Sequence, residues 1–316
     1  MAPPSTHDRV VAAVAARLSA AGVPGAHAEA RWLVEHVLRE VSAPVADPSR
    51  RGGEVAERPV PAERPPADPV ARPVEARVEA LVLRRLAGEP LQLLLGRWPF
   101  RTVELELVPG VFVPRPETEV VAGVAIDHAR RLGPGALVAE PCTGSGAIAA
   151  SLLAEVDDVE VYATDRSAAA VALARRNLAA ITPGPLPPRA HVLEGDLLAP
   201  LPSRLCGRLD LLVANPPYLP CDDLGHLATE VAGHDPPAAL FGGVDGHEVV
   251  DRLLAAAGTW VRPGGVVVLE IDDRRGEQAC DAARAAGLEG VHLVTDLTGR
   301  DRAVVATSPA ASGRRS

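Results

Sequence analysis

The chain contains no lysine, because all 32 of its basic residues are arginine. Without a lysine amine the protein cannot form a Schiff base with pyridoxal phosphate or with a carbonyl substrate. It also has no P-loop lysine to contact the γ-phosphate of a nucleotide. Schiff-base enzymes and P-loop nucleotide hydrolases are therefore excluded.

Cysteines and long apolar runs are also scarce. The four cysteines form no CxxC pair and no Cys/His cluster with metal-ligand spacing, so we expect a cytoplasmic protein without a metal site. No run approaches the roughly 18 apolar residues of a membrane helix. The apolar run at residues 10–16 is flanked by Asp8, Arg9 and Arg17, so we expect neither a signal peptide nor contact with a membrane.

The net charge of −9 argues against a surface built to hold nucleic acid, and we expect no direct nucleic-acid binding. A chain of 316 residues can bury the core of one large domain and still form a small one. We expect a monomer.

Residues 1–90 predict a small helical domain. Residues 8–40 and 74–88 carry apolar residues at helical spacing. Between them, residues 42–73 are dense in Pro, Arg and acids, which predicts a flexible insertion. Residues 91–118 contain the segment TVELELVPGVFVPR, whose alternation and Pro-Gly pair predict a β-hairpin that links two domains.

Residues 119–310 predict an α/β domain, and residues 311–316 a tail. Short strand-like segments alternate with helix-like ones, which is typical of a doubly wound, mainly parallel sheet. The strand-like segments are ALVAE, EVYATD, HVLEGD, LDLLVAN and GVVVLEI, followed by GVHLVTD and RAVVATS as an antiparallel pair at the edge. We therefore predict a Rossmann-like sheet of seven strands.

A glycine-rich turn follows the first of these strands and predicts a ligand-binding loop. Its glycines would let a ligand approach the backbone closely, and the N–H groups at the helix start favour an anion. Such a turn is about as often a plain tight turn, and its spacing departs from the dinucleotide GxGxxG pattern. The candidate residues are Glu140, Pro141, Cys142, Thr143, Gly144 and Gly146.

The next two strands end in acidic residues that suit a nucleoside. Asp165 could accept hydrogen bonds from both hydroxyls of a ribose, or it could cap the helix that starts at Ser167. Asp196 and Leu197 stand where an adenine could be hydrogen-bonded and covered. With no phosphate-binding Lys or Arg nearby, this pattern favours an adenosyl ligand without phosphate, and S-adenosylmethionine is the best match.

The strand LDLLVA runs into Asn215, Pro216, Pro217 and Tyr218 at the sheet edge where α/β proteins bind ligands. A planar nitrogen is a poor nucleophile, so it must be held with its lone pair aimed at a methyl donor. The Asn215 side-chain oxygen and the Pro216 carbonyl can accept its two N–H bonds, while the prolines fix the direction of that carbonyl. Tyr218 would supply a flat wall. These acceptors would stabilise the positive charge that develops on the nitrogen, so no dedicated base is required. A plain Pro-rich loop with a packing tyrosine is the alternative.

Five motifs, in their order along the chain, resemble the PrmC/HemK family of peptide chain release factor N5-glutamine methyltransferases. They are LAGEPLQLLLGRWPF (86–100), PGVFVPRPETE (109–119), EPCTGSGAIA (140–149), NPPY (215–218) and HDPPAALFGGVDGHEVV (234–250). The resemblance implies a helical N-terminal domain that helps to bind the substrate protein and a C-terminal class I methyltransferase domain. It also implies S-adenosylmethionine as cofactor and the glutamine of the release factor GGQ motif as methyl acceptor.

By position, the resemblance implies that residues 140–144 form the cofactor loop, with Asp165 on the ribose and Asp196 and Leu197 on the adenine. It implies that residues 215–218 clamp the substrate amide. It further implies that one short element closes over the methionine end of the cofactor and that one aromatic lies near the active site. That element contains Arg115, Glu117 and Thr118, and the aromatic is Phe100.

The chain departs from the family pattern at three places, one of which is the Pro/Arg-rich insertion (42–73) within the predicted substrate-recognition domain. Glu140-Pro141 stands where the family more often has Asp and a small or aliphatic residue, and His234, expected as an exposed loop histidine, replaces an aromatic or acidic neighbour. Three alternatives therefore stay open. A paralogue could methylate another amide, and a DNA or RNA base methyltransferase would use the same clamp on a flipped base. A non-catalytic cofactor-binding module is the third, although the intact residues 215–218 speak against it.

Overall fold

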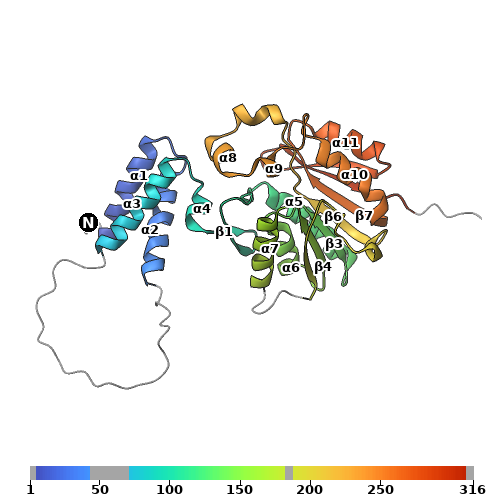
Figure 1. Cartoon of the computed structure of the whole chain (residues 1–316), viewed down its shortest axis with the longest axis horizontal. Coiled ribbons are helices and arrows are strands. Elements are labelled where there is room, and N and C mark those ends of the chain that lie inside the picture. The colour runs from blue at the N-terminus through green and yellow to red at the C-terminus, as the bar shows by residue number, and fades with distance from the viewer. Residues whose placement is uncertain (1–4, 43–70, 182–187, 311–316) are drawn as a thin grey trace, which may run out of the picture. The chain divides into compact units, whose positions relative to one another are not determined.

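The computed structural model describes residues 5–42, 71–181 and 188–310 (Figure 1). The chain divides into two compact units, residues 1–95 and 96–316. Most of the predicted insertion (42–73) and the tail (311–316) lie outside the described residues. Ser42 and residues 71–73 are helical, so the insertion as predicted is one residue too long at its start and three too long at its end.

The first unit is helical, as predicted, with α1 (Thr6–Ala20), α2 (Ala26–Ser42), α3 (Ala71–Leu86) and α4 (Leu91–Leu95). Helix α1 begins with a capping box, in which Ser5 Oγ accepts the Asp8 N–H at 3.1 Å and the Asp8 carboxylate accepts the Ser5 N–H at 3.2 Å. The core of this first unit includes Leu18 of α1, Leu33 of α2 and Val82 of α3, all fully buried. These apolar residues recur at helical spacing, which is why the sequence pattern identified the helices.

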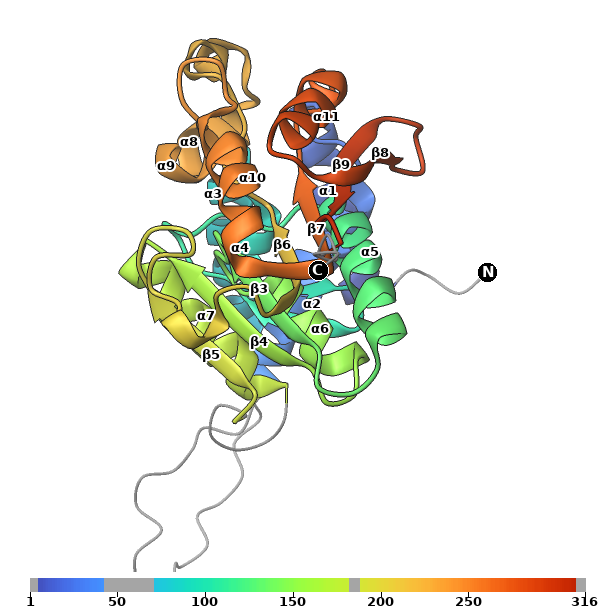
Figure 2. The same ribbon diagram turned by 90° about the vertical axis from the view of Figure 1, so that its right-hand side faces the viewer.

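The second unit contains a seven-stranded mixed sheet in the order β5-β4-β3-β6-β7-β9-β8 (Figure 2), which confirms the predicted fold class. Strands β3 to β7 are parallel, and β9 runs antiparallel to both β7 and β8. Their bounds are β3 (Leu137–Pro141), β4 (Glu160–Asp165), β5 (Ala190–Glu194), β6 (Leu209–Ala214), β7 (Val261–Glu270), β8 (Glu289–Thr295) and β9 (Asp301–Thr307).

Helices cover this sheet because alternate strand residues point to opposite faces. Leu212 of β6 and Leu269 of β7 pack in one core cluster with apolar residues of α10 and α11. Helix α5 packs against β6, β7 and β9. The helices of the unit are α5 (Thr118–Leu132), α6 (Ala147–Glu155), α7 (Ala168–Ala180), α8 (Thr229–His234), α9 (Pro237–Leu240), α10 (Glu248–Trp260) and α11 (Gly276–Ala285).

The predicted hairpin exists, but its turn lies earlier in the chain. Strand β1 (Arg97–Phe100) pairs with β2 (Val103–Glu106) across a turn at Arg101, and Pro109-Gly110 lies beyond the hairpin. Arg101 has φ +51° and its guanidinium binds the Glu155 carboxylate at 2.8 Å. This long-range ion pair holds the turn, so local Pro-Gly chemistry does not determine it.

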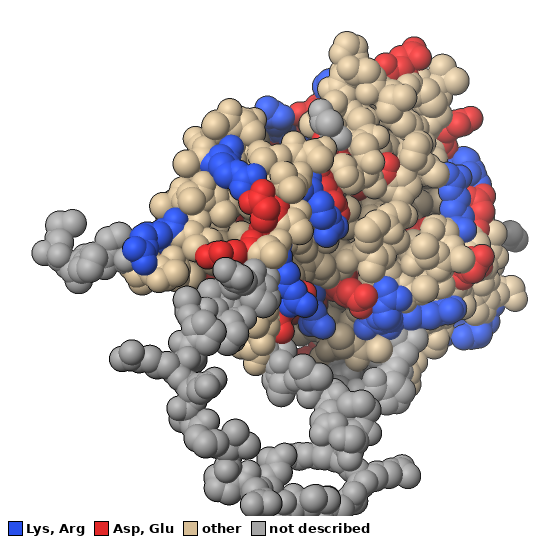
Figure 3. Space-filling model, turned by 60° about the vertical axis from the view of Figure 1, so that its left-hand side comes forward, with Lys and Arg blue, Asp and Glu red and all other residues tan. Residues whose placement is uncertain are grey.

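Charged side chains of both signs are interspersed over the face drawn in Figure 3. Many exposed charges elsewhere in the described chain are paired, such as Arg176 with Glu106 at 3.0 Å. Surface pairs of this kind contribute little stability each. On the face shown, neither acidic nor basic side chains gather into one large area.

Candidate active site

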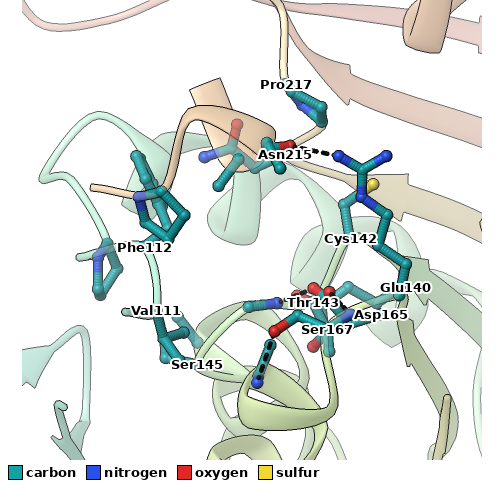
Figure 4. A pocket seen from close by; sticks show the side chains of 18 of the residues that line it. Val111, Phe112, Glu140, Cys142, Thr143, Ser145, Asp165, Ser167, Asn215 and Pro217 are labelled. Atoms are coloured by element: carbon teal, nitrogen blue, oxygen red, sulfur yellow. Dashed lines mark hydrogen bonds between the residues drawn. The ribbon is translucent and has the colours of Figure 1, made fainter. Parts of the chain in front are cut away.

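A cavity of about 210 Å³ lies at the carboxyl ends of β3, β4 and β6 (Figure 4). In the close-up, Glu140, Thr143 and Asp165 lie on one side, Asn215 and Pro217 on another, and Val111 and Phe112 on a third. The cavity therefore brings together residues more than a hundred positions apart. The predicted site residues that line it are Thr118, Glu140, Cys142, Thr143, Gly144, Asp165, Asp196, Leu197, Asn215 and Pro217.

The loop after β3 takes a left-handed path. Cys142, Gly144 and Gly146 have φ of +59°, +55° and +80°. A Cβ at Gly146 would lie 2.7 Å from Leu178 Cδ1, so this glycine lets the loop pack on α7 and does not line the cavity. Burial raises the pKa of the Cys142 thiol to about 12, so the thiol stays neutral and is no nucleophile.

Asp165 ties the first loop to the second. Its Oδ2 accepts the Gly144 N–H and its Oδ1 accepts the Ser167 N–H, both at 2.9 Å. Helix α7 begins at Ala168, and its side-chain cap is Ser167, which accepts the Ala170 N–H. Ser167, rather than Asp165, therefore provides the side-chain cap of this helix. The Asp165 carboxylate faces the cavity.

Glu140 is a buried acid at the end of β3. Its Oε2 accepts the Thr143 hydroxyl at 2.8 Å and the Ala149 N–H at 3.0 Å. Burial raises its pKa to about 8, and the nearby Asp165 charge acts in the same direction. Near neutral pH this carboxyl is mostly protonated unless a cation lies beside it.

Two arginines line the cavity, where the sequence led us to expect no phosphate-binding Lys or Arg, and both have protein partners. Arg252 of α10 pairs with Asp196, and Arg166 donates to the Ala238 carbonyl at 3.2 Å. Arg166 directly follows Asp165 and could have been noticed in the sequence. Arg252 comes from a helix whose position depends on the tertiary fold.

Asn215 projects from the carboxyl end of β6 into the cavity. Its Nδ2 donates to Thr118 Oγ1 at 3.1 Å, and no residue in the described part of the chain hydrogen-bonds its Oδ1. Pro216 is buried and Tyr218 half-buried, and neither lines the cavity. The Tyr218 hydroxyl donates to Glu270 Oε1 at 3.2 Å.

The outer wall of the cavity comes from residues 110–118 and 236–239. Asp235 holds these segments together, since its carboxylate accepts the Val113 N–H at 3.2 Å and pairs with Arg115. The Arg115 guanidinium also lies over the Phe112 ring, 5.3 Å from its centroid. Arg115 therefore braces this wall and does not line the cavity.

Three residues singled out in the sequence lie apart from the cavity. Phe100 is buried in β1, and Glu117 is half-buried with its Oε1 3.9 Å from an Arg302 nitrogen. His234 is half-buried at the end of α8, so the expectation of an exposed loop histidine is wrong.

The GGVDG element (242–246) packs its backbone directly on the loop that contains Asn215. A Cβ at Gly242 would lie 2.4 Å from the Pro217 carbonyl oxygen, and one at Gly246 would lie 2.4 Å from that of Tyr218. The Gly242 N–H donates to the Leu219 carbonyl at 2.9 Å. Glycine is thus required where two backbones meet.

Sequence reasoning missed Glu270, the last residue of β7. It is 2% exposed and lies beneath the loop at Tyr218. An acid that ends the strand paired with β6 was the available signal, because the carboxyl ends of adjacent parallel strands meet at one edge.

The described residues contain neither a candidate metal site nor a candidate membrane-spanning helix. No group of three or more His, Cys, Asp or Glu side chains in this part of the chain could hold a metal ion. None of the described helices has the length and hydrophobicity to cross a bilayer.

The mixed seven-stranded sheet, with its cavity at the carboxyl ends of the parallel strands, has the architecture of a Rossmann-like methyltransferase. Residues 134–230 match the family model described as methyltransferase small domain. The release factor glutamine methyltransferase of Streptomyces coelicolor is 44% identical over 209 residues, which cover 65% of this chain and 70% of that protein.

Two further relatives of the same description match at greater length. The relatives from Mycobacterium tuberculosis (strain H37Rv) and Deinococcus radiodurans are both 37% identical to this chain, and each alignment covers 92% of it. The alignments cover 88% of the M. tuberculosis protein and 94% of the D. radiodurans protein. This chain belongs to the release factor glutamine methyltransferase family. The comparison confirms the resemblance drawn from the five motifs and makes the protein a methyl-transferring enzyme.

Proposed function

We propose that this protein transfers a methyl group from S-adenosylmethionine to the side-chain amide nitrogen of a glutamine in peptide chain release factors. The observation that carries this proposal is that Asn215 lines the same cavity as Glu140 and Asp165. An amide-binding side chain and cofactor-binding acids thereby meet in one space. The names of the relatives support the choice of release factors as substrate.

The residues of the cavity fit S-adenosylmethionine. Asp165 would accept the ribose hydroxyls, and Asp196 and Leu197 would bind and cover the adenine. Glu140 is a buried carboxyl with a raised pKa, which suits a cationic ammonium group as partner. Both lining arginines already have protein partners, Arg166 through the Ala238 carbonyl and Arg252 through Asp196, which suits a cofactor without phosphate.

S-adenosylmethionine, when bound, would supply an electrophilic methyl group to the amide nitrogen, which leaves S-adenosylhomocysteine and one amide proton that passes to water. The clamp of residues 215–218 orients that nitrogen. Asn215 Oδ1 and the Pro216 carbonyl would accept its two N–H bonds, and Tyr218 would flank the amide plane. Both acceptors face positive charge only as the reaction proceeds, so they stabilise the transition state more than the ground state.

The remaining assignments follow the same proposal. Arg115, Glu117 and Thr118 would shape the end of the cavity near the cofactor's methionine, and Phe100 would support the active site from β1. Residues 1–90 would help to recognise the release factor, residues 91–118 would link the domains, and residues 119–310 would carry out catalysis.

Intact-mass analysis tests this function directly. A purified release factor incubated with the protein and S-adenosylmethionine should gain one methyl group, and fragmentation should locate it on the GGQ glutamine. A release factor with that glutamine changed to alanine is the matched control and should gain none. Transfer to another residue, or none despite measured cofactor binding, would contradict the proposal.

A further inference from the structure

Glu270 lies beside the clamp but outside the cavity. Strands β6 and β7 are paired in parallel up to Ala214 and Leu269, so the next residues, Asn215 and Glu270, lie side by side where both strands end. Glu270 is 2% exposed, and its Oε2 is one of two buried side-chain atoms in the described residues without a hydrogen-bond partner. A buried carboxyl in this position requires an explanation.

Two hydroxyl groups connect Glu270 to the clamp. The Tyr218 hydroxyl donates to its Oε1 at 3.2 Å. The Thr118 hydroxyl lies near enough to the same carboxyl to lower its pKa, and Thr118 Oγ1 accepts a hydrogen bond from Asn215 Nδ2 at 3.1 Å. Thr118 thus stands between Glu270 and Asn215.

The direction of these bonds follows from the chemistry of the groups. An ionised carboxylate can only accept, and Glu270 Oε2 has no other partner, so the single hydroxyl proton of the nearby Thr118 is available to it. The Thr118 oxygen is then left as an acceptor, and Asn215 must present its NH₂ group to it. The Asn215 Oδ1 is thereby turned toward the cavity, where the substrate amide needs an acceptor.

We propose that Glu270 is a positioning residue that fixes the orientation of the Asn215 side chain through Thr118 and holds the Tyr218 ring in place. This inference rests on the proposed role of residues 215–218 as the amide clamp. Glu270 touches neither the cavity nor the reacting atoms.

The positioning role of Glu270 can be tested because it depends on the charge state of its carboxyl. Burial raises its pKa to about 7, against hydrogen bonds from Thr118 and Tyr218. Arg302 of β9 favours the ionised form, and Glu117 at the start of α5 opposes it. Below pH 7 the protonated carboxyl becomes a donor, Thr118 can reverse its bond, and Asn215 is no longer held in one orientation.

The test is kcat against pH at saturating S-adenosylmethionine and release factor. Glu270→Gln presents one donor where the wild type has only acceptors. Thr118→Val removes the link, and Thr118→Ser restores the hydroxyl. Glu160→Gln is the control, because Glu160 also accepts a tyrosine hydroxyl, that of Tyr162 at 2.6 Å, but stands at the start of β4 rather than at a strand end beside the clamp.

At pH 8 we expect kcat to fall about tenfold in Glu270→Gln and Thr118→Val, which corresponds to one lost positioning bond. Glu160→Gln should stay within about twofold of the wild type, and Thr118→Ser should recover most of the kcat that Thr118→Val loses. The wild-type kcat should decline below pH 7 and that of Glu270→Gln should not. The Kd of Glu270→Gln for S-adenosylmethionine should be unchanged.

Wild-type kcat in Thr118→Val, or the same low-pH decline in Glu270→Gln as in the wild type, would overturn the proposal. A lower melting temperature with an unchanged pH profile would reduce Glu270 to a structural role and overturn it as well. If the wild type itself transfers no methyl group, the proposed function fails and this proposal fails with it.

Discussion

Glu140 should make cofactor binding depend on pH. Its pKa of about 8 in the free protein means that the carboxyl is protonated in roughly nine molecules of ten at pH 7. A bound cationic ammonium favours the carboxylate, so binding at pH 7 should release about 0.9 proton from this group. Ionising it at that pH costs about 1.4 kcal/mol, so its contribution to affinity should rise about tenfold between pH 7 and the plateau above pH 8.

Isothermal titration calorimetry in buffers of different ionisation enthalpy counts the protons released. The matched control is Glu140→Gln, in which the cofactor's own amino group still titrates but residue 140 does not. The wild type should release more protons than the variant by nearly one at pH 7. Equal proton release in the two proteins would refute the assignment of Glu140 to the ammonium group.

The same carboxyl should affect stability without ligand. Between pH 4.5 and 8 the folded protein binds more protons at Glu140 than the unfolded chain, so the free energy of unfolding should fall as pH rises through this window. The upper limit of this loss is about 5 kcal/mol. Urea titrations at pH 5 and pH 8.5 should show a smaller difference in Glu140→Gln, and an equal difference would contradict the buried, protonated state.

Three substitutions separate the proposed roles further. Asn215→Ala should lower kcat by about a hundredfold or more while calorimetry shows unchanged cofactor binding, because the clamp touches only the acceptor; loss of both together would show that the division of roles is wrong. Asp165→Ala should weaken cofactor binding by about 10- to 100-fold through lost ribose hydrogen bonds, and unchanged affinity would exclude the ribose role. Gly242→Ala should lower the melting temperature and kcat, because its Cβ would lie 2.4 Å from the Pro217 carbonyl oxygen; wild-type values for both would show that the loop adapts.

The structural features that could be predicted from the sequence are those that depend on local residue patterns. The strands were predictable because each is a short apolar run, and the positions of Asp165 and Asn215 followed because both residues end such runs. Parallel strands bring their carboxyl ends to one edge, so the sequence alone indicated which residues would meet.

The unpredicted part depends on long-range contacts. The hairpin turn at Arg101 is held by Glu155, 54 residues away, and Arg115 pairs with Asp235, 120 residues away. Arg252 reaches the cavity only because α10 packs on the sheet. Local periodicity carries no information about such partners.

The contact between the GGVDG element and the clamp divides that loop into fixed and variable positions. Gly242 and Gly246 have no room for a side chain, whereas Val244 between them is 84% exposed. Side chains of many sizes can therefore be placed at Val244 without disturbing the clamp backbone. Residue 244 is therefore a position at which a label or a bulky side chain can be introduced while the clamp backbone keeps its place.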